Sequence, residues 1–290
     1  MPSPLDEFPI RRLTIGDLRF CADLSENRGW PREEHKWGLL LTAGTGYGID
    51  DPEGKGLATA CVVTSYGDTP SGSPGLAAVG MVLVAEKYAR QGVGRRLMQH
   101  VLAAFAGTPL TLHATPCGQP LYEQLGFIAS GRAEMVSGRF RPHGQAPKIA
   151  TRPATASDLQ EILRLDGDVF GEDRTRMITR LPAFADRFRV TEDATGITGY
   201  AAAWPNMATD VVGPLIARDT ETAKALIASL AAGSDRPLRT DIDVRHQELL
   251  EWIKAAGAET VAFNTVMTYG IPALPGDWTR RFAPLTVAAG

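Results

Sequence analysis

Cysteine is scarce in this chain, and its spacing excludes two kinds of cross-linked fold. The 290 residues contain only Cys21, Cys61 and Cys117, which are far apart and form no C-x-x-C pair. This pattern is neither that of a disulfide framework nor that of a cysteine-ligated zinc site, so we expect free thiols in a reducing compartment. The five histidines also lack metal-ligand spacing. We therefore predict no metal site.

Long apolar runs and an excess of positive charge are also missing. No stretch approaches the ~18 consecutive apolar residues of a membrane-spanning helix. The first residues lack the basic and apolar regions of a signal peptide. The formal net charge of −3 is without the basic excess typical of nucleic-acid-binding proteins. We therefore expect a cytoplasmic protein that binds neither a membrane nor nucleic acid.

The chain has the composition of a globular protein and contains an internal repeat. Apolar residues make up 44% and charged residues 22%, and this length predicts about two domains. The capping-box pattern from Thr14 to Asp17 is echoed from Thr155 to Asp158 at one constant offset. Residues 141–148, with two prolines, a glycine and no periodicity, predict a linker. The expected domains are 1–140 and 149–290.

Strand and helix patterns alternate through the first half. Strands are expected at 8–13, 47–49, 57–66, 76–84 and 109–113, helices at 14–27, 31–43, 93–105 and 118–126, a long loop at 67–75, and one or two closing strands within 127–136. Such a mixture predicts an α+β fold.

One glycine turn in this series has the features of an anion site. Between an apolar strand and a helical pattern stands the run Arg90-Gln91-Gly92-Val93-Gly94-Arg95-Arg96. Two glycines let the backbone approach a ligand closely, and the helix start offers unpaired N–H groups with a positive dipole end. A P-loop would need Lys-Ser/Thr after the glycine, and a Rossmann fingerprint would need a third glycine. By itself the turn leaves a phosphate site and a plain tight turn as alternatives.

The second copy lacks this turn. After its equivalent strand, residues 211–217, Asp219 and Glu221 stand at the helix start where the first copy has glycines. Carboxylates there cap their own helix and repel a phosphate. We expect only the first copy to bind an anionic cofactor.

Together with a second motif, the glycine turn resembles the GNAT superfamily of N-acetyltransferases. The strand, turn and helix from Val82 to Leu102 are followed by Ala114-Thr115-Pro116-Cys117-Gly118-Gln119-Pro120-Leu121-Tyr122-Glu123-Gln124-Leu125-Gly126-Phe127. The second half resembles the degenerate domain that ends some bacterial tandem GNAT proteins, on Phe170 to Arg174 and Gly213-Pro214-Leu215. The resemblance implies two tandem GNAT-like domains, each a central, mostly antiparallel sheet flanked by helices.

The resemblance also implies acetyl-CoA as co-substrate and a set of residues that hold it. A strand that splays near its end would hold pantetheine and acetyl group, and the turn would hold the pyrophosphate. The matching positions are Val82, Leu83, Val84, Arg90, Gln91, Gly92, Val93, Gly94, Arg95 and Tyr122. One departure is Ala89, where the family usually has Gln or Arg.

The implied reaction is direct attack of a primary amine on the thioester. The backbone N–H of Val84 would stabilise the carbonyl oxygen, and Tyr122 matches the tyrosine that protonates the leaving thiolate in the family. The second copy has Ile253 at the equivalent position. That copy therefore has neither the turn nor the acid.

The acceptor side is less determined. Glu34, with neighbours Glu33 and His35, is the candidate general base, although carboxylates are favoured at a solvated helix N-terminus in any case, which is the simpler explanation of these residues. Candidate substrate contacts are Trp30, Trp37, Asp173 and Arg174, and His113 is either cleft-facing or structural. The acceptor is a small-molecule or peptide amine, and a homodimer stays open. The alternative function is a CoA-responsive binding or regulatory protein with little turnover.

Overall fold

A single large sheet runs through the whole molecule. The computed structural model describes residues 5, 7–54, 56–68, 74–141 and 147–290. In these residues 13 strands form one sheet in the order β1-β2-β3-β4-β5-β12-β6-β11-β10-β9-β8-β7, with β13 paired to β10 outside this path. Among the described pairings, only β4–β5 and β10–β11 are parallel. The fold is therefore mixed α/β and mostly antiparallel, but the two halves share one sheet instead of having one each.

The first half contains the elements expected from its sequence, in the expected order, together with one short helix that was not predicted, η2 (Glu86–Tyr88). They are β1 (Arg11–Leu13), the short helix η1 (Ile15–Asp17), α1 (Leu18–Asn27), α2 (Glu34–Ala43), β2 (Thr45–Asp50), β3 (Leu57–Asp68), β4 (Pro74–Val84), the short helix η2 (Glu86–Tyr88), α3 (Val93–Ala104), β5 (Leu110–Ala114), α4 (Gln119–Gln124) and β6 (Ile128–Gly138). The first strand is shorter than predicted, and β3 and β4 extend into the predicted loop. Of that loop, residues 69–73 lie outside the described residues.

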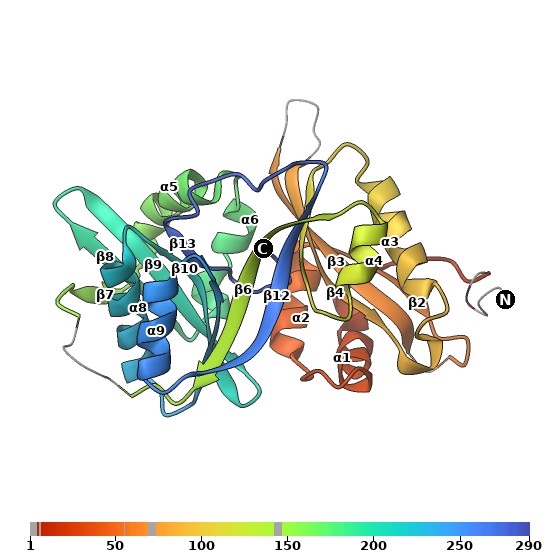
Figure 1. Cartoon of the computed structure of the whole chain (residues 1–290), viewed down its shortest axis with the longest axis horizontal. Coiled ribbons are helices and arrows are strands. Elements are labelled where there is room, and N and C mark those ends of the chain that lie inside the picture. Colours follow the sequence, from red (N-terminus) through yellow and green to blue (C-terminus); the bar gives the residue numbers. More distant parts are fainter. Residues whose placement is uncertain (1–4, 6, 55, 69–73, 142–146) are drawn as a thin grey trace.

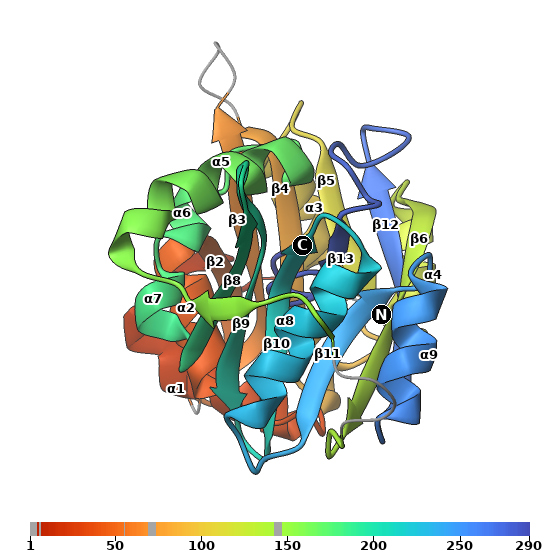
Figure 2. The same cartoon turned by 90° about the vertical axis from the view of Figure 1, so that its left-hand side faces the viewer.

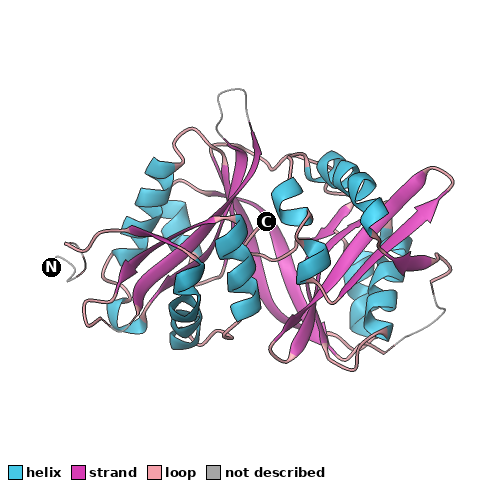
Figure 3. Cartoon of the chain, turned by 180° about the vertical axis from the view of Figure 1, so that it is seen from behind, coloured by secondary structure: helices cyan, strands magenta, loops and turns pink. Residues whose placement is uncertain are grey.

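The second half repeats this pattern with variations. Its elements are β7 (Thr151–Pro153), the short helix η3 (Ala156–Asp158), α5 (Leu159–Phe170), α6 (Thr175–Ile178), α7 (Leu181–Phe184), β8 (Arg187–Asp193), β9 (Gly196–Asn206), β10 (Thr209–Ala217), α8 (Thr220–Ala232), β11 (Leu238–Asp243), α9 (Gln247–Ala255), β12 (Glu259–Tyr269) and β13 (Arg281–Ala283). Helices flank the strands on both sides (Figure 3). Seen from the end, α8 packs against β8, β9 and β10 (Figure 2). No helix in the described part of the chain is long and apolar enough to cross a membrane.

The two halves exchange strands where they meet. Strand β12 of the second half lies between β5 and β6 of the first half, and β6 lies between β12 and β11. Figure 1 shows β6 and β12 side by side. The register pairs Thr268 with Thr111 on one side, and Val136 with Thr240 on the other. Neither half has a complete sheet without the other. The predicted linker falls between β6 and β7, and its residues 142–146 lie outside the described part.

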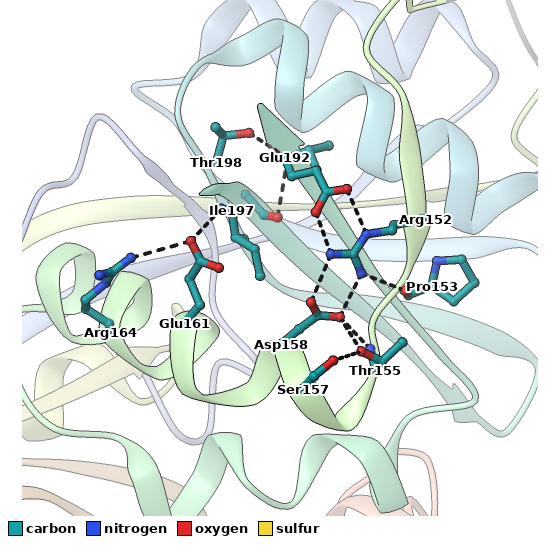
Figure 4. Close-up of polar contacts among 12 residues, drawn as sticks. Arg152, Pro153, Thr155, Ser157, Asp158, Glu161, Arg164, Glu192, Ile197 and Thr198 are labelled. Atoms are coloured by element: carbon teal, nitrogen blue, oxygen red, sulfur yellow. Dashed lines mark hydrogen bonds and ion pairs between the residues drawn. The ribbon is translucent and has the colours of Figure 1, made fainter. Parts of the chain in front are cut away.

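The repeated capping box has the same structure in both halves, which supports a duplication. The N–H of Thr14 donates to Asp17 at 2.8 Å, and the N–H of Thr155 donates to Asp158 at 2.7 Å. An arginine from the preceding strand then joins this carboxylate to a second acid. Arg11 bridges Asp17 and Asp50, and Arg152 bridges Asp158 and Glu192 (Figure 4). The predicted tandem organisation is confirmed.

Two apolar cores lie on opposite faces of the first half's strands. One lies beneath α3 and α4 and contains Val79, Leu112 and Tyr122. The other lies beneath α1 and α2, contains Met81, and continues into the second half through Trp204. Because side chains alternate along a strand, β4 contributes to both cores. This alternation gives β4 one face toward α3 and another toward the second half.

Candidate functional site

Strands β4 and β5 begin as partners and then separate. Their parallel pairing ends with Val79 opposite Leu112, yet β4 continues to Val84 and β5 to Ala114. The separation begins at a bulge in β4. The register with β3 shifts between Ala60 and Val62, and Met81 has a positive φ of 53°. A bulge turns a strand away from its neighbour, so a gap opens inside the sheet.

Backbone groups of β4 beyond the bulge point into this gap. The N–H of Ala85 donates to the carbonyl of Ala58 on β3 at 2.8 Å. Backbone groups of successive residues point to opposite edges of an antiparallel strand. Those of Val82 and Val84 therefore point away from β3, toward the edge that β5 has left. The resemblance to the GNAT superfamily predicts a splayed strand at these residues.

The glycine turn continues the path of the gap. Gly92 has φ 81°, is exposed, and precedes α3 without a side-chain cap. The first bond between helix and turn runs from the N–H of Arg96 to the carbonyl of Gly92 at 3.0 Å, so the N–H groups of the first turn precede any intrahelical bond. A Cβ on Gly94 would stand 3.4 Å from a methyl of Val84. The open helix end and the strand end are thus direct neighbours, as an anion site requires.

The three arginines of the turn have different environments. Arg96 donates to the carbonyls of Leu5 and Phe8, both at 2.7 Å, so it fixes the N-terminal segment. Arg95 bonds to Gln124 on α4. Arg90 is exposed. The side chains of Arg90 and Arg95 are therefore the two that remain near the surface of the turn.

Tyr122 lies on the α3–α4 face of the sheet, in the same apolar cluster as Val79 and Leu112. Its ring packs edge-on against Phe127, with centroids 5.9 Å apart. Burial raises the pKa of the Tyr122 phenol above its ordinary value, with a smaller contribution from Cys61. Among the described residues its hydroxyl makes no recorded hydrogen bond. The Tyr122 hydroxyl therefore keeps its proton and donates it to none of the described residues.

A cavity of about 520 Å³ lies on the face of β4 opposite to that core. Gly80 and Met81 of the bulge and His113 of β5 reach it from the two separating strands. Its other walls come from the start of α2, from β6, β11, β12 and the β9–β10 turn, from Thr115 and Pro116 after β5, and from Val287 and Ala288 near the C-terminus, so both halves of the chain line it. Burial lowers the pKa of His113 to about 3, so its imidazole is neutral at pH 7, and its buried Nδ1 has no partner among the described residues.

A buried polar cluster stands at the far wall of the cavity. Glu33 forms a close ion pair with Lys36 and accepts a hydrogen bond from Asn206 at 2.8 Å. Arg239 approaches Glu33 at 3.5 Å and Asp241 at 3.6 Å. Burial lowers the pKa of Lys36 and raises that of Asp241. Asn206 Oδ1 and Arg239 Nε are buried without a partner in the described part of the chain.

The residues predicted for the acceptor side do not come together. Trp30 lines the cavity, whereas Trp37 is fully buried and donates to Ser25 at 2.9 Å. Asp173 accepts the N–H of Thr175 at the start of α6.

The other two candidates also lie away from the cavity. The carboxylate of Glu34 is half exposed and pairs with Arg32 at 2.8 Å. Arg174 is buried against Asp166. Their roles stay predictions. Sequence reasoning missed Asn206 and Arg239, because only tertiary packing brings these second-half residues to the first half's cavity.

The equivalent gap in the second half is occupied. Strands β10 and β11 pair in parallel only at Asp210 and Val211. Beyond them β13 pairs with β10 at Leu215 and Ile216. Helix α8 is capped by Asp219, whose carboxylate accepts the N–H of Thr222 at 2.8 Å. The second half thus has neither an open gap nor an open helix end.

Comparisons with known proteins agree on one family for both halves. Two family models, each described as an acetyltransferase (GNAT) domain, match residues 62–140 and 162–283. The chain is 28% identical over 238 residues to the uncharacterized N-acetyltransferase YitH of Bacillus subtilis, covering 81% of this chain and 80% of YitH.

Solved structures show the same fold across the chain. A putative acetyltransferase from Pyrococcus horikoshii superposes with a TM-score of 0.80 at 18% identity, covering 98% of this chain and 96% of that one. A tandem GNAT protein from the clavulanic acid biosynthesis pathway gives a TM-score of 0.64 at 16% identity, with 91% and 98% covered. At these identities the likeness concerns the fold alone.

Proposed function

This chain is an N-acetyltransferase with two GNAT domains in tandem, and we propose that its first domain transfers the acetyl group of acetyl-CoA directly to a primary amine. The gap between β4 and β5 carries this proposal. It has Tyr122 on one face and a cavity on the other, with free backbone groups of β4 along its edge. An amine can approach from the cavity while the thiol leaves toward Tyr122.

The residues around the gap fit the cofactor that GNAT enzymes use. The N–H groups of Val93, Gly94 and Arg95 at the start of α3 would hold the pyrophosphate, because they have no partner in the described part of the chain and lie at the positive helix end. Arg90, Gln91 and Arg95 supply charge and donors around them, with Gln91 anchored to the carbonyl of Lys87 at 2.9 Å. The edge of β4 from Val82 to Val84 would hold the pantetheine.

The acetyl oxygen and the leaving sulfur then each have a partner in the chain. Acetyl-CoA supplies an acetyl group activated as a thioester. The N–H of Val84 donates to the acetyl oxygen, where negative charge grows during attack; that of Val82 points the same way and is nearer the bulge. The amine nitrogen bonds to the acetyl carbon as the C–S bond breaks. Tyr122 gives its proton to the sulfur, the amine loses one proton to solvent, and Tyr122 regains one from solvent before the next turnover.

The second domain is proposed to act without cofactor of its own. Strand β13 fills its gap, and Asp219 occupies its helix start. A carboxylate there would repel a phosphate. It contributes β12 to the shared sheet and part of the wall of the cavity that would receive the acceptor amine.

The first test combines turnover with cofactor binding. The protein is incubated with acetyl-CoA and a panel of amines, and release of free thiol is followed. In parallel, Gly94→Ala adds a methyl group that meets no atom closer than 3.4 Å in the protein. Alanine is also the better helix former, so the variant should fold while acetyl-CoA affinity falls at least about 10-fold through loss of close approach.

Gly167→Ala in α5 is the matched control, because that glycine is also helical and a Cβ there meets nothing within 4 Å. Its acetyl-CoA affinity should equal that of the wild type. Equal affinity in the Gly94 variant would contradict the proposed cofactor site. Binding of acetyl-CoA without thiol release for any amine would favour the second candidate, a CoA-responsive binding protein. Two observations favour this second candidate. Ala89 stands in place of the usual Gln or Arg, and Glu34 points outward.

A further inference from the structure

The cavity between the two halves has a chemistry that selects among amines. Resting on the function proposed above, we propose that the acceptor is an apolar amine that also carries a carboxylate, as a hydrophobic amino acid does. In this arrangement the carboxylate binds Arg239, the amine lies between the carbonyl oxygen of Asn206 and the bulge of β4, and the apolar group lies against the cavity wall. Each part of this assignment follows from a separate feature of the cavity.

Charge is the first feature. Among the described residues that line the cavity, the charged side chains are Glu33, Lys36 and Arg239. Glu33 is already bound by Lys36 and by the amide of Asn206. Its carboxylate also faces Arg239, at 3.5 Å. The lining therefore carries one more cation than anion, while Asp241 lies behind it, 3.6 Å from Arg239 and outside the lining.

Arg239 is the cation with unused bonding capacity. A guanidinium has five N–H donors in a planar fork. The two acids near Arg239 stand at 3.5 and 3.6 Å, longer than a normal charge-assisted hydrogen bond. Its Nε is buried without a partner in the described part of the chain, although its side chain lines the cavity. A carboxylate matches such a fork with two parallel bonds, which makes this the anion that the site fits best.

Asn206 adds a second unused group beside Arg239. Its residue is 6% exposed, its amide N–H binds Glu33, and its carbonyl oxygen has no partner among the described residues. An unpaired buried acceptor is unfavourable unless a ligand or water donates to it. An amino group next to a carboxylate supplies that donor, so Asn206 and Arg239 together match the two ends of one amino acid.

The walls determine the rest of the molecule. Trp30, Met207 and Val261 are 37, 65 and 61% exposed, which is high for large apolar residues, and all three line the cavity. Large exposed apolar residues that gather around one cavity mark a binding site. At about 520 Å³ the cavity lies within the size range of small-molecule sites. Polyamines fit poorly, because no lining carboxylate in the described residues is free to receive a second ammonium group.

The test compares amines that differ only in the carboxylate. L-phenylalanine and 2-phenylethylamine share the ring and the amine, and spermidine represents the polyamines. Calorimetric binding is measured with the full chain saturated with CoA, and thiol release is measured with acetyl-CoA. We expect phenylalanine to bind about 10- to 100-fold more tightly than 2-phenylethylamine, the worth of hydrogen bonds to a charged group, and to be preferred in kcat/KM.

Arg239→Met should reduce this ratio to about one, and Arg239→Lys should retain part of it because a positive charge stays. Arg164→Met is the matched control, since that side chain is 71% exposed on α5. Trp30→Ala should weaken both ligands equally while the ratio stays. Circular dichroism and thermal unfolding verify that each variant is folded, and the wild-type ratio decides the proposal if an Arg239 variant is not.

The outcomes separate this proposal from the function on which it rests. A wild-type protein that binds 2-phenylethylamine or spermidine as tightly as phenylalanine overturns the assignment, even when thiol is released. A ratio that Arg239→Met leaves unchanged overturns the role of Arg239. Thiol release from no amine, together with the expected binding ratio, overturns the proposed transfer and leaves the selectivity of the cavity standing.

Discussion

Removal of one oxygen atom, by Tyr122→Phe, tests the proposed leaving-group acid. The phenyl ring stays, and with it the edge-on contact with Phe127. The hydroxyl makes no recorded hydrogen bond among the described residues, so its loss leaves no buried partner unsatisfied. We therefore expect the melting temperature to change little and the acetyl-CoA affinity to stay within about twofold, since the turn at Gly92 is untouched.

The rate should change much more than stability. A positioned general acid contributes about 10²–10⁴-fold to kcat, which corresponds to about 2.7–5.4 kcal/mol of activation free energy. Burial raises the pKa of the Tyr122 phenol, so the phenol stays protonated at the working pH. The same shift makes it a weaker acid, so we expect the lower end of this range. Water has little access to replace it.

The assay is thiol release at saturating acetyl-CoA and amine, with calorimetry and thermal unfolding on the same samples. Thiol release must be the slow step, which single-turnover measurement verifies. A folded variant with the wild-type kcat would exclude Tyr122 as the proton donor. A variant with unchanged kcat but weakened acetyl-CoA binding would make it a contact residue instead.

Three further predictions concern the frame around the site. Gly80→Ala places a Cβ 2.2 Å from the backbone oxygen of Ala288, and overpacking of this kind should lower the unfolding free energy by about 1–3 kcal/mol in urea titration; an unchanged midpoint would contradict this contact. Asp166→Ala leaves the buried Arg174 without its carboxylate partner. It should lower the unfolding free energy by about 3–5 kcal/mol in the same assay, and a loss of less than about 1 kcal/mol would contradict this prediction. Arg152 holds the pKa of Asp158 below its ordinary value. The ionised Asp158 therefore stabilises the fold fully above the unfolded pKa of 3.8, and this stabilisation is lost as the pH falls below 3.8. Asp158→Asn should therefore lose less stability than the wild type between about pH 4 and 2; parallel curves would contradict it.

Local patterns in the sequence predicted the parts of the site that adjacent residues build. The capping boxes at Thr14 and Thr155, and the open helix start at Gly92, depend on backbone conformation over three or four residues. Residue type and spacing decide such conformations. The same holds for Asp219, whose cap on α8 the sequence pattern predicted.

Only the folded start of α2 shows which of Glu33 and Glu34 faces the interior. Glu33 and Glu34 are equivalent in a sequence pattern, and Glu34 was the candidate. In the structure Glu33 is buried against Lys36, while Glu34 turns to Arg32 at the surface. A shift of one residue around a helix start rotates a side chain by about 100°. No pattern in this short segment indicated which of the two would face inward.

Sequence by itself determined the family resemblance, the duplication and the position of the glycine turn, because each depends on a short run of residues. Tertiary structure decided the exchange of β6 and β12, the filling of the second gap by β13, and the shared cavity. These features bring together residues such as Glu33 and Arg239 that are far apart in the chain. Their proximity depends on the packing of the whole sheet, which no local spacing contains.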